Sequence, residues 1–532
     1  MTDVITHYLD VWTSAIASKS NAGRGTSDKH TAYGIKKLRE LIFEIASAGL
    51  LIHKEIDTAE KKVKLGEVVT LVMGQAPPGN ECNKEGIGTI FVKTGEFGPI
   101  YPEVKEWTTK PLKYAQLGDV LICVVGATVG KLNLAIDCAI GRSVAAIRPN
   151  EELDTNYLFF ALMPYTLKLR NQSRGSAQGV IGKEELNSVE IRLPCLAEQH
   201  RIVAKVDELM ALCDQLEQQQ TNSIAAHQTL VQTLLDTLTQ AADTAQFEQA
   251  WSRIADHFDT LFTTESSINQ LKQTLLQLAV MGKLVPQNPN DEPATELLMR
   301  IQVEKANLIE EGKIKKDKLL AAIREEEKPF ELPKGWEWVR LGVVFDIAGG
   351  VTLGRKLTGP DLAELPYLRV ANVQRGHLVL DSIKTVEIRQ SELARYQLLK
   401  NDLLVTEGGD WDKVGRTAIW NSEIDNCLHQ NHIFRMRGLT EDLSSSWVEM
   451  YMNSIAKAYF QAASKQTTNL ASINMTQLKN CLLVVPALQE QHRIVAKVDE
   501  LMALCDALKA RIASAQTTQL QLADAIVEQA VA

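Results

Sequence analysis

Apolar residues recur at helical spacing in two separate stretches of the chain. In the first stretch these residues lie four, three, four and three positions apart: Ile202, Val206, Leu209, Cys213 and Leu216. The second stretch continues the same spacing: Ile494, Val498, Leu501, Cys505, Leu508 and Ile512. Such seams are typical of helices that pack along their length. Two seams in one chain could bury each other as an antiparallel coiled coil with an internal pseudo-two-fold axis. The alternative is an ordinary amphipathic helix that packs on its own domain.

These seams belong to an internal repeat. Glu198–Asp214 and Glu490–Asp506 both read EQHRIVAKVDELMALCD, 490 − 198 = 292 positions apart. A weaker repeat at 271 − 38 = 233 positions pairs Leu38, Ile42, Ile45, Ala46, Gly49 and Leu51 with Leu271, Leu275, Leu278, Ala279, Gly282 and Leu284. The chain therefore consists of two units in tandem, each with the order helix, globular block, helix.

The blocks between the helices differ far more than the helices do. Short Val, Ile and Leu runs broken by Gly, Asn and Pro predict mixed strands and turns in both. A motif of Gly118–Leu121 leading to Val129–Lys131 returns as Asn401–Leu404 leading to Val414–Arg416. The fold class we expect is α+β, with two mixed α/β blocks separated by long paired helices.

The expected domains follow from these boundaries. They are an N-terminal helical region (1–62), a first block (63–194), a central helical region with connector (195–330), a second block (331–486) and a C-terminal helix (487–532). A helix of about 30 residues is about 45 Å long. It could hold two blocks roughly one DNA turn, about 34–36 Å, apart.

The charge distribution permits DNA binding, and the composition argues against a membrane protein or a secreted protein. The 532 residues carry a net charge of −9, but residues 61–194 sum to +2 and residues 334–486 to +1, which leaves −12 for the rest. Two near-neutral blocks in an acidic frame permit DNA binding by local patches. The eight scattered cysteines fit free thiols, and neither a membrane span nor a secretory signal is expected, so we expect a cytoplasmic protein.

Amide and basic side chains on the predicted loops are candidates for DNA contacts, because such groups read base edges and phosphates. In the first block they are Lys93, Thr94, Lys131, Arg142 and Gln178; in the second they are Arg369, Asn372, Gln374, Arg375, Lys413, Arg416, Gln430, Asn431, Thr467, Thr468 and Asn469. For any single one of them, a solvated turn remains the alternative.

No catalytic or metal-binding motif stands out. The chain lacks the Asp/Asn-Pro-Pro-aromatic loop with which amino-methyltransferases hold a flipped base. Gly126–Leu132 is one residue too short for a phosphate-binding loop and ends in Leu. His429 and His432 have no third ligand at suitable spacing. His200 and His492 adjoin the repeated helix starts, where capping or packing is expected.

The repeated helices, the two divergent blocks and the phrase Pro-x-Leu-x-Glu-Gln-His-Arg-Ile-Val resemble the specificity subunits of Type I restriction–modification enzymes. Trp12–Ala15, Ala22–Gly25, Tyr33–Leu41 and Gly282–Ala294 look like the subfamily lettered IB. The resemblance implies two target-recognition domains that each bind about half of an interrupted site in double-stranded DNA. It also implies two methyltransferase subunits and two ATP-driven restriction subunits as partners, which hold S-adenosylmethionine, ATP and Mg, while this chain binds no cofactor.

Two other functions stay open at this point. A coiled-coil scaffold that binds only proteins fits the acidic frame but gives no reason for two diverged blocks on matched helices. A stand-alone modification or cleavage enzyme conflicts with the missing motifs.

Overall fold

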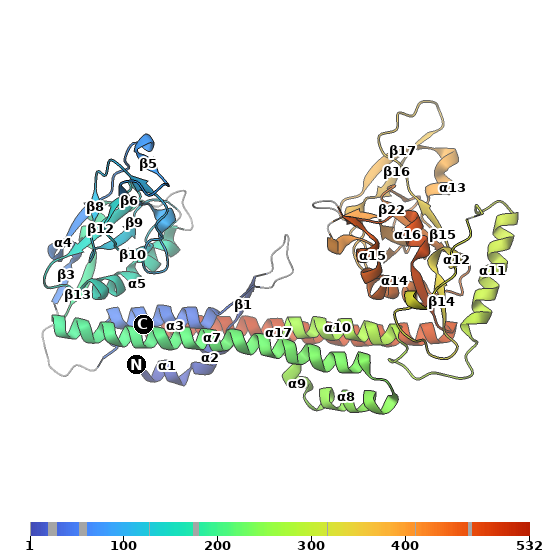
Figure 1. Ribbon diagram of the computed structural model, residues 1–532, viewed down its shortest axis with the longest axis horizontal. Helices are drawn as coiled ribbons and strands as arrows, with labels where there is room; N and C mark the ends of the chain where they lie inside the picture. Colours follow the sequence, from blue (N-terminus) through green and yellow to red (C-terminus); the bar gives the residue numbers. More distant parts are fainter. Residues whose placement is uncertain are drawn as a thin grey trace. The chain divides into compact units, whose positions relative to one another are not determined.

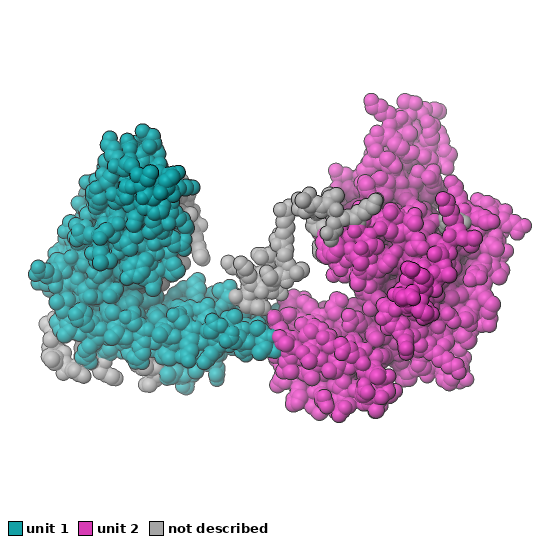
Figure 2. All heavy atoms as spheres, in the orientation of Figure 1, with its two compact units in different colours: residues 1–226, 513–532 teal, residues 227–512 magenta. Residues whose placement is uncertain are grey.

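The computed structural model describes residues 2–19, 29–52, 61–126, 128–173, 180–316, 318–409, 411–466 and 471–531. The chain divides into two compact units, drawn in different colours in Figure 2. Unit 1 holds residues 1–226 and 513–532, and unit 2 holds residues 227–512. Each unit contains one block with sheets and a set of helices, as Figure 1 shows.

Unit 1 begins with three helices and a short hairpin and continues into the first block. Its elements are α1 (Thr2–His7), α2 (Leu9–Ser14), β1 (Ala17–Lys19), β2 (Lys29–Thr31), α3 (Tyr33–Ser47), β3 (Lys61–Lys64), α4 (Leu65–Val68), β4 (Val69–Met73), η1 (Gly79–Glu81), β5 (Cys82–Asn83), β6 (Thr89–Val92), η2 (Thr94–Glu96), β7 (Trp107–Thr108), β8 (Tyr114–Ala115), β9 (Val120–Cys123), β10 (Leu132–Leu134), β11 (Cys138–Ile140), β12 (Val144–Pro149), α5 (Thr155–Ser173), α6 (Lys183–Ser188), β13 (Glu190–Leu193) and the first part of α7 (Leu196–Gln240).

Unit 2 repeats this order with longer connections. Its elements are the end of α7, α8 (Thr244–Asp256), α9 (Phe258–Leu261), α10 (Glu265–Val280), α11 (Ala294–Glu310), η3 (Glu325–Glu327), β14 (Glu337–Arg340), α12 (Leu341–Val344), β15 (Phe345–Gly349), β16 (Leu362–Leu368), η4 (Val370–Asn372), β17 (Lys384–Arg389), η5 (Gln390–Glu392), α13 (Leu393–Tyr396), β18 (Leu403–Thr406), β19 (Gly408–Gly409), η6 (Trp411–Lys413), β20 (Thr417–Ile419), β21 (Leu428–His429), β22 (Ile433–Gly438), α14 (Ser445–Asn453), α15 (Ile455–Ala463), β23 (Lys465–Gln466), β24 (Ala471–Ser472), α16 (Met475–Asn480), β25 (Leu482–Val485) and α17 (Leu488–Val531), whose last part returns to unit 1.

The two blocks share one topology although their sequences have diverged. The central antiparallel sheet has the order β10-β9-β12-β4 in unit 1 and β20-β18-β22-β15 in unit 2. Beside it, β6 pairs parallel with β11, and β16 pairs parallel with β21. A two-stranded ribbon, β3 with β13 and β14 with β25, joins the start and end of each block. The runs around Val120 and Leu403, predicted as strands, are the buried centre strands β9 and β18.

The long helices α7 and α17 pair antiparallel, as the seams predict. Unit 1 combines the first part of α7 with the last part of α17, and unit 2 combines the last part of α7 with the first part of α17. The fold class expected from the sequence, α+β with two mixed blocks and long paired helices, is confirmed.

The expectation that the two identical seams bury each other is wrong. In unit 1, Ile202, Val206, Leu209 and Leu216 pack with α3 and with Ala523 and Ile526 near the end of α17. In unit 2, Leu501 and Leu508 pack with α10 and with Val231, Leu235 and Leu238 near the end of α7, while Ile494 and Val498 pack into the second block. The reason is the antiparallel pairing of two helices of 45 and 44 residues, which brings the start of one helix to the end of the other.

The weaker repeat forms α3 in unit 1 and α10 in unit 2, and each of these helices packs beside α7 and α17. Arg39 of α3 forms an ion pair with Asp214 of α7 (2.7 Å), and Lys272 of α10 forms one with Asp506 of α17 (2.5 Å). The repeat offsets of 233 and 292 positions map the first pair onto the second. In each unit, a helix of the weaker repeat therefore contacts a helix of the stronger repeat in the same way.

No helix among the described residues is long and apolar enough to cross a bilayer. All eight cysteines are free.

A buried carboxylate in unit 2 makes stability depend on pH. Burial raises the pKa of Glu449 on α14 to about 7, and Asp499 adds to the rise. Because this pKa lies above the ordinary value of 4.5, unit 2 loses stability relative to the unfolded chain as the pH rises from about 4.5 to 7. Glu449→Gln keeps an oxygen to accept the hydrogen bond from the Ile419 amide (3.0 Å) and cannot ionise.

We therefore expect Glu449→Gln to match the original chain at pH 5 and to be more stable by about 2 kcal/mol at pH 8. Urea unfolding at both pH values measures this difference. Glu387→Gln, a change of an exposed carboxylate on β17, is the control and should show no gain. Equal stability of Glu449→Gln and the original chain at pH 8 would contradict the expectation.

Candidate nucleic-acid interface

The described candidates of the first block lie on the loops around β6, β10 and β12. Lys93 caps η2 and forms an ion pair with Glu106, and its ammonium lies 5.5 Å from the centre of the Phe91 ring. Thr94 is the first residue of η2 and is half-buried. Lys131 donates a hydrogen bond to the carbonyl of Phe97, which fixes the turn after η2.

Arg142 is the exposed candidate of this block. It lies in the turn between β11 and β12, where the two sheets of the block meet. Gln178 lies outside the described residues. Among the described candidates of this block, Arg142 is therefore the one whose side chain is exposed.

The second block brings four of its candidates together. Arg416 donates to the side-chain oxygen of Gln374 (2.6 Å), and Arg375 donates to the carbonyl of Val414 (3.3 Å). Lys413 ends the short helix η6 in the same loop. The turn after η4 and the loop before β20 thus form one polar cluster, although about 40 positions separate them in the sequence.

Arg369 and Asn372 stabilise this block from inside. Asn372 is 3% exposed, accepts a hydrogen bond from the Arg369 amide (2.8 Å) and donates to the carbonyl of Val379 (2.8 Å). Arg369 donates to the carbonyl of Ser382 (2.9 Å). Since Asn372 is almost fully buried and both of its amide atoms are bonded within the block, this residue holds the turn.

The remaining candidates divide between described and undescribed residues. Gln430 and Asn431 are half-buried in the turn between β21 and β22. This turn corresponds to the turn between β11 and β12 that holds Arg142 in the first block. Thr467, Thr468 and Asn469 lie outside the described residues.

Sequence reasoning missed a buried ion pair that occurs in both blocks. Asp119, just before β9, accepts two hydrogen bonds from Arg148 on β12 (2.8 and 2.9 Å). Asp402, just before β18, accepts two from Arg437 on β22 (both 2.7 Å). Both aspartates are 1% exposed. The Gly-Asp and Asn-Asp motifs of the sequence could have pointed to these aspartates, because the same motif precedes a strand in both blocks. Gly118 and Asn401 adopt positive φ values of 93° and 69°.

The repeated glutamine ties each block to its long helix. The side-chain oxygen of Gln199 accepts from the Asp154 amide (2.8 Å), and its amide donates to the Pro194 carbonyl (2.8 Å). Gln491 accepts from the Ser444 amide (3.0 Å) and donates to the Pro486 carbonyl (2.9 Å). Both side chains are fully buried, so each helix start is locked to the first turn of α5 or α14.

His429 and His432 lie close together in the sequence but face different partners. His429 is buried, its ring Nδ1 lies 2.9 Å from the Ile433 carbonyl, and burial lowers its pKa to about 4. His432 faces Glu407 at 2.6 Å. Among the described residues, no group of three or more His, Cys, Asp or Glu side chains is placed to hold a metal ion.

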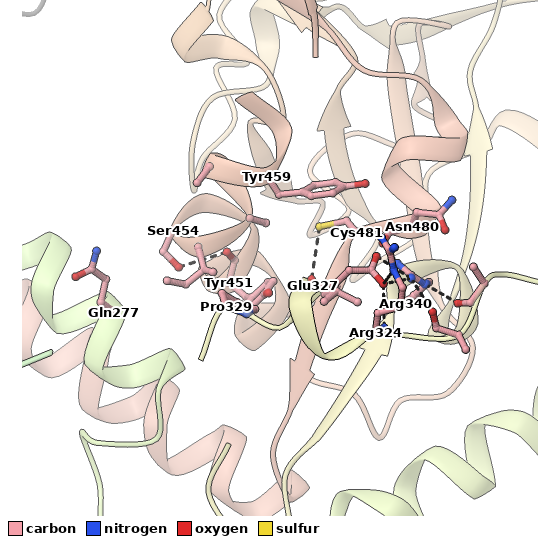
Figure 3. A pocket seen from close by; sticks show the side chains of 16 residues that line it. Gln277, Arg324, Glu327, Pro329, Arg340, Tyr451, Ser454, Tyr459, Asn480 and Cys481 are labelled. Atoms are coloured by element: carbon pink, nitrogen blue, oxygen red, sulfur yellow. Dashed lines mark hydrogen bonds and ion pairs between the residues drawn. The ribbon is translucent and has the colours of Figure 1, made fainter. Parts of the chain in front are cut away.

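A pocket of about 680 Å³ in unit 2 lies between the connector before β14 and the helices α14 and α15, as the close view in Figure 3 shows. Arg340 forms one side of it and donates to Glu327 (3.0 Å) and to the carbonyls of Ala321 (2.8 Å) and Asn480 (2.8 Å). These bonds fasten the connector to the block. The pKa of Glu327 falls to about 2, because the Arg324 amide and Arg340 both donate to its carboxylate.

Removal of one arginine should strongly destabilise a block. Arg437→Met leaves the Asp402 carboxylate buried with the Leu399 amide as its remaining partner. We expect a loss of about 2–4 kcal/mol in the stability of unit 2, measured by urea unfolding. The double change Asp402→Asn with Arg437→Met removes the stranded charge and should recover most of this loss. A single variant as stable as the original chain would refute the role of the pair.

The chain carries two copies of one α+β block, and each copy is fixed to the start of a long helix. This arrangement is that of a tandem protein that presents two different surfaces on matched helices. The chain belongs to the Type I restriction modification DNA specificity family, whose family model matches residues 59–226 and 333–515.

Its similarity to relatives extends over the whole chain. The EcoAI specificity subunit of the Type I restriction enzyme from Escherichia coli is 35% identical over 99% of both chains, and the EcoEI specificity subunit from the same organism is 33% identical over 99% of both. Among solved structures, the HsdS subunit from Thermoanaerobacter tengcongensis is 30% identical over 40% of this chain and 62% of that chain, with a TM-score of 0.30. A chain from a structure of a type I R-M system is 19% identical over 90% of this chain and 99% of its own, with a TM-score of 0.47.

Proposed function

We propose that this chain is the specificity subunit of a Type I restriction–modification complex. It recognises an interrupted, two-part site in double-stranded DNA and directs adenine methyltransferase and restriction subunits to that site. Residues 63–194 and 331–486 are the two target-recognition domains, and the segments 1–62, 195–330 and 487–532 form the helical frame. The protein acts in the cytoplasm.

One observation carries this proposal: the same fold and the same anchors bear two different sets of loops. The buried Asp–Arg pair, the parallel strand pair and the locking glutamine occur in both blocks. The residues that differ include those on the turns after η2 and η4 and on the loops before β10 and β20. A shared frame with different loops suits a protein that reads two different base sequences with one geometry.

The chemistry belongs to the partners in this proposal. S-adenosylmethionine binds to two methyltransferase subunits, and ATP and Mg bind to two restriction subunits, while this chain recognises DNA without catalysis. In the recognition domains, Arg142 and the cluster of Gln374, Arg375, Lys413 and Arg416 are the proposed DNA contacts among the described residues. Lys93, Lys131, Arg369 and Asn372 hold the loops in place.

Methylome sequencing of cells that carry this chain together with its methyltransferase subunit tests the proposal. We expect adenine methylation at one interrupted two-part motif. Unchanged methylation despite complex formation would support the protein scaffold instead. Methylation or cleavage by this chain alone would show that it is an enzyme.

A further inference from the structure

A six-residue turn of the same construction follows η2 in the first block and η4 in the second. The two ends of the turn meet in an antiparallel bridge, between Phe97 and Pro102 in unit 1 and between Val373 and Leu378 in unit 2. We call each of these segments, 97–102 and 373–378, the bridged turn. The two turns have equal lengths, so their residues can be compared position by position.

The main chain of each bridged turn is fastened to the edge strand of the central sheet. In unit 1 the amide of Leu134 on β10 donates to the Ile100 carbonyl (2.7 Å). In unit 2 the Gly376 amide donates to the carbonyl of Thr417 on β20 (3.0 Å). The backbone of the turn therefore belongs to the shared frame of both blocks.

The basic residue of the repeated Val-Gly-Lys/Arg motif holds the same turn in both blocks. Lys131 donates to the Phe97 carbonyl, and Arg416 donates to the side-chain oxygen of Gln374 (2.6 Å). With the bridges aligned, Phe97 is the first position of its turn and Gln374 is the second position of the other. The motif that the sequence repeats thus fixes the turn in unit 1 and in unit 2.

The tips of the two bridged turns differ in chemistry. In the alignment, Ile100 and Tyr101 correspond to Gly376 and His377. Ile100 is 52% exposed and Tyr101 is 50% exposed, and both residues of the second tip are exposed as well. The first block therefore presents an aliphatic and an aromatic side chain at positions where the second block has no side chain and an imidazole.

The first bridged turn is stiff although it exposes apolar side chains. Pro99 and Pro102 fix the φ angle at two of its positions. Gly98 lies so close to the Tyr101 carbonyl that a Cβ has no room there. Exposed apolar side chains are unfavourable in water, and on a stiff segment they lose little conformational entropy when they bind. These properties suit a preformed contact with a ligand.

A basic side chain lies close to the start of this turn. Arg142 is exposed in the turn between β11 and β12. The adjacent Gly141 packs against Lys93, since a Cβ on Gly141 would lie 3.1 Å from the Lys93 Cγ atom. Lys93 directly precedes η2, which leads into the bridged turn. A phosphate contact at Arg142 is therefore compatible with a base contact at the tip.

The three carboxylates nearest to the turn in the sequence are all bonded. Glu106 forms an ion pair with Lys93, and Glu103 forms one with Lys105 (2.6 Å). Glu96 accepts a hydrogen bond from the Lys93 amide (2.8 Å). The two ion pairs neutralise charge beside the turn, so the phosphate backbone of DNA can approach it.

We propose that the first bridged turn enters the major groove of DNA and that Ile100 and Tyr101 read the 5-methyl groups of thymine. The inference rests on the proposed function, in which residues 63–194 recognise one half of the DNA site. In the major groove, thymine is the base that presents a methyl group, and apolar side chains are its complement. His377, at the position of Tyr101, offers ring nitrogens that hydrogen-bond to base edges. The bridged turn is thus one specificity-determining element with a different chemistry in each block.

Competition binding of the assembled complex to duplexes in which deoxyuridine replaces thymine tests the inference. Deoxyuridine pairs with adenine as thymine does and lacks only the 5-methyl group. For the original chain, replacement throughout the half-site of the first block should weaken binding about fourfold for each methyl group in contact. The double variant Ile100→Ala with Tyr101→Ala should bind the thymine duplex at least about tenfold more weakly and should bind both duplexes equally.

Three controls accompany this measurement. Tyr101→Phe keeps the ring and should keep the discrimination between thymine and deoxyuridine. Leu117→Ala changes a leucine that is 71% exposed in the same block and lines a surface pocket with Leu196 of α7; it should bind like the original chain. Deoxyuridine in the other half-site should affect the double variant and the original chain equally.

The half-site of the first block is the part of the methylated motif that disappears when a second copy of residues 331–486 replaces residues 63–194. A first half-site without thymine, equal binding of the original chain to both duplexes, or discrimination retained by the double variant would each overturn the inference. Failure of the proposed function has a different signature, because scrambling either half-site then leaves the affinity of the original complex unchanged.

Discussion

A chain in which a second copy of residues 331–486 replaces residues 63–194 directs methylation to a site built from two copies of one half-sequence. This is the largest change in specificity that we expect from any rearrangement of the chain. The original half-sequence read by the first block disappears from the motif, because that block no longer exists in the complex.

The structure explains why such a graft should fold. Both blocks enter and leave through the same two-stranded ribbon, and both are followed by the identical segment that carries the locking glutamine. The contacts of the glutamate at the helix start must change: Glu198 pairs with Arg192 (3.0 Å), whereas Glu490 accepts from Trp336 (2.8 Å) and Gln287 (2.7 Å). Trp336 travels with the grafted block and can meet Glu198. The graft loses the Gln287 bond and the bonds of Arg340 to Glu327 and to the Ala321 carbonyl, because these partners lie outside residues 331–486.

Methylome sequencing of cells that carry the grafted chain and the methyltransferase subunit gives the readout. A motif that keeps both original half-sequences would show that the blocks do not determine them. Urea unfolding of the purified graft separates this result from a failure to fold.

Matched insertions of four residues, one in α7 between residues 221 and 240 and one in the facing part of α17, should lengthen the spacer and leave both half-sequences intact. Four helical residues add about 6 Å, which corresponds to one or two base pairs along DNA. Both helices must be lengthened, because each packs against the other in both units.

The spacer length in the methylated motif is the measurement for this second prediction. Conservative substitutions of exposed residues in the same helix stretch, without any insertion, are the control and should keep the spacer. New half-sequences with an unchanged spacer would contradict the division of labour between helices and blocks.

The sequence predicted the frame well and the packing partners less well. The seam spacing identified α7 and α17, because helical periodicity is a local property. The packing of Leu209 near the end of α17 and of Leu501 near the end of α7 follows from antiparallel overlap, which the pattern of a single helix does not contain. The weaker repeat around Leu38 and Leu271 was the available clue, since it marks the third helix in each unit.

The candidate DNA contacts were harder to derive, because residue type does not distinguish a side chain that reads DNA from one that holds a loop. Asn372 looks like a base-reading amide in the sequence and is buried in a turn. Arg416 and Gln374 bind each other across a long sequence separation, which only the fold reveals. The Asp–Arg pairs give a structural role to Asp119 and Asp402, whose motifs the sequence shows only as a repeat.

The proposed function requires above all that each block reads its own half of the DNA site. Competition binding of the assembled complex to duplexes with one half-site scrambled measures this directly, for the original chain and for the grafted chain. For the original chain, either scrambled half should weaken binding by at least about a hundredfold. For the grafted chain, scrambling the half-site of the lost block should have no effect, and scrambling the other half should still weaken binding. A grafted complex that continues to discriminate both original halves would contradict the account.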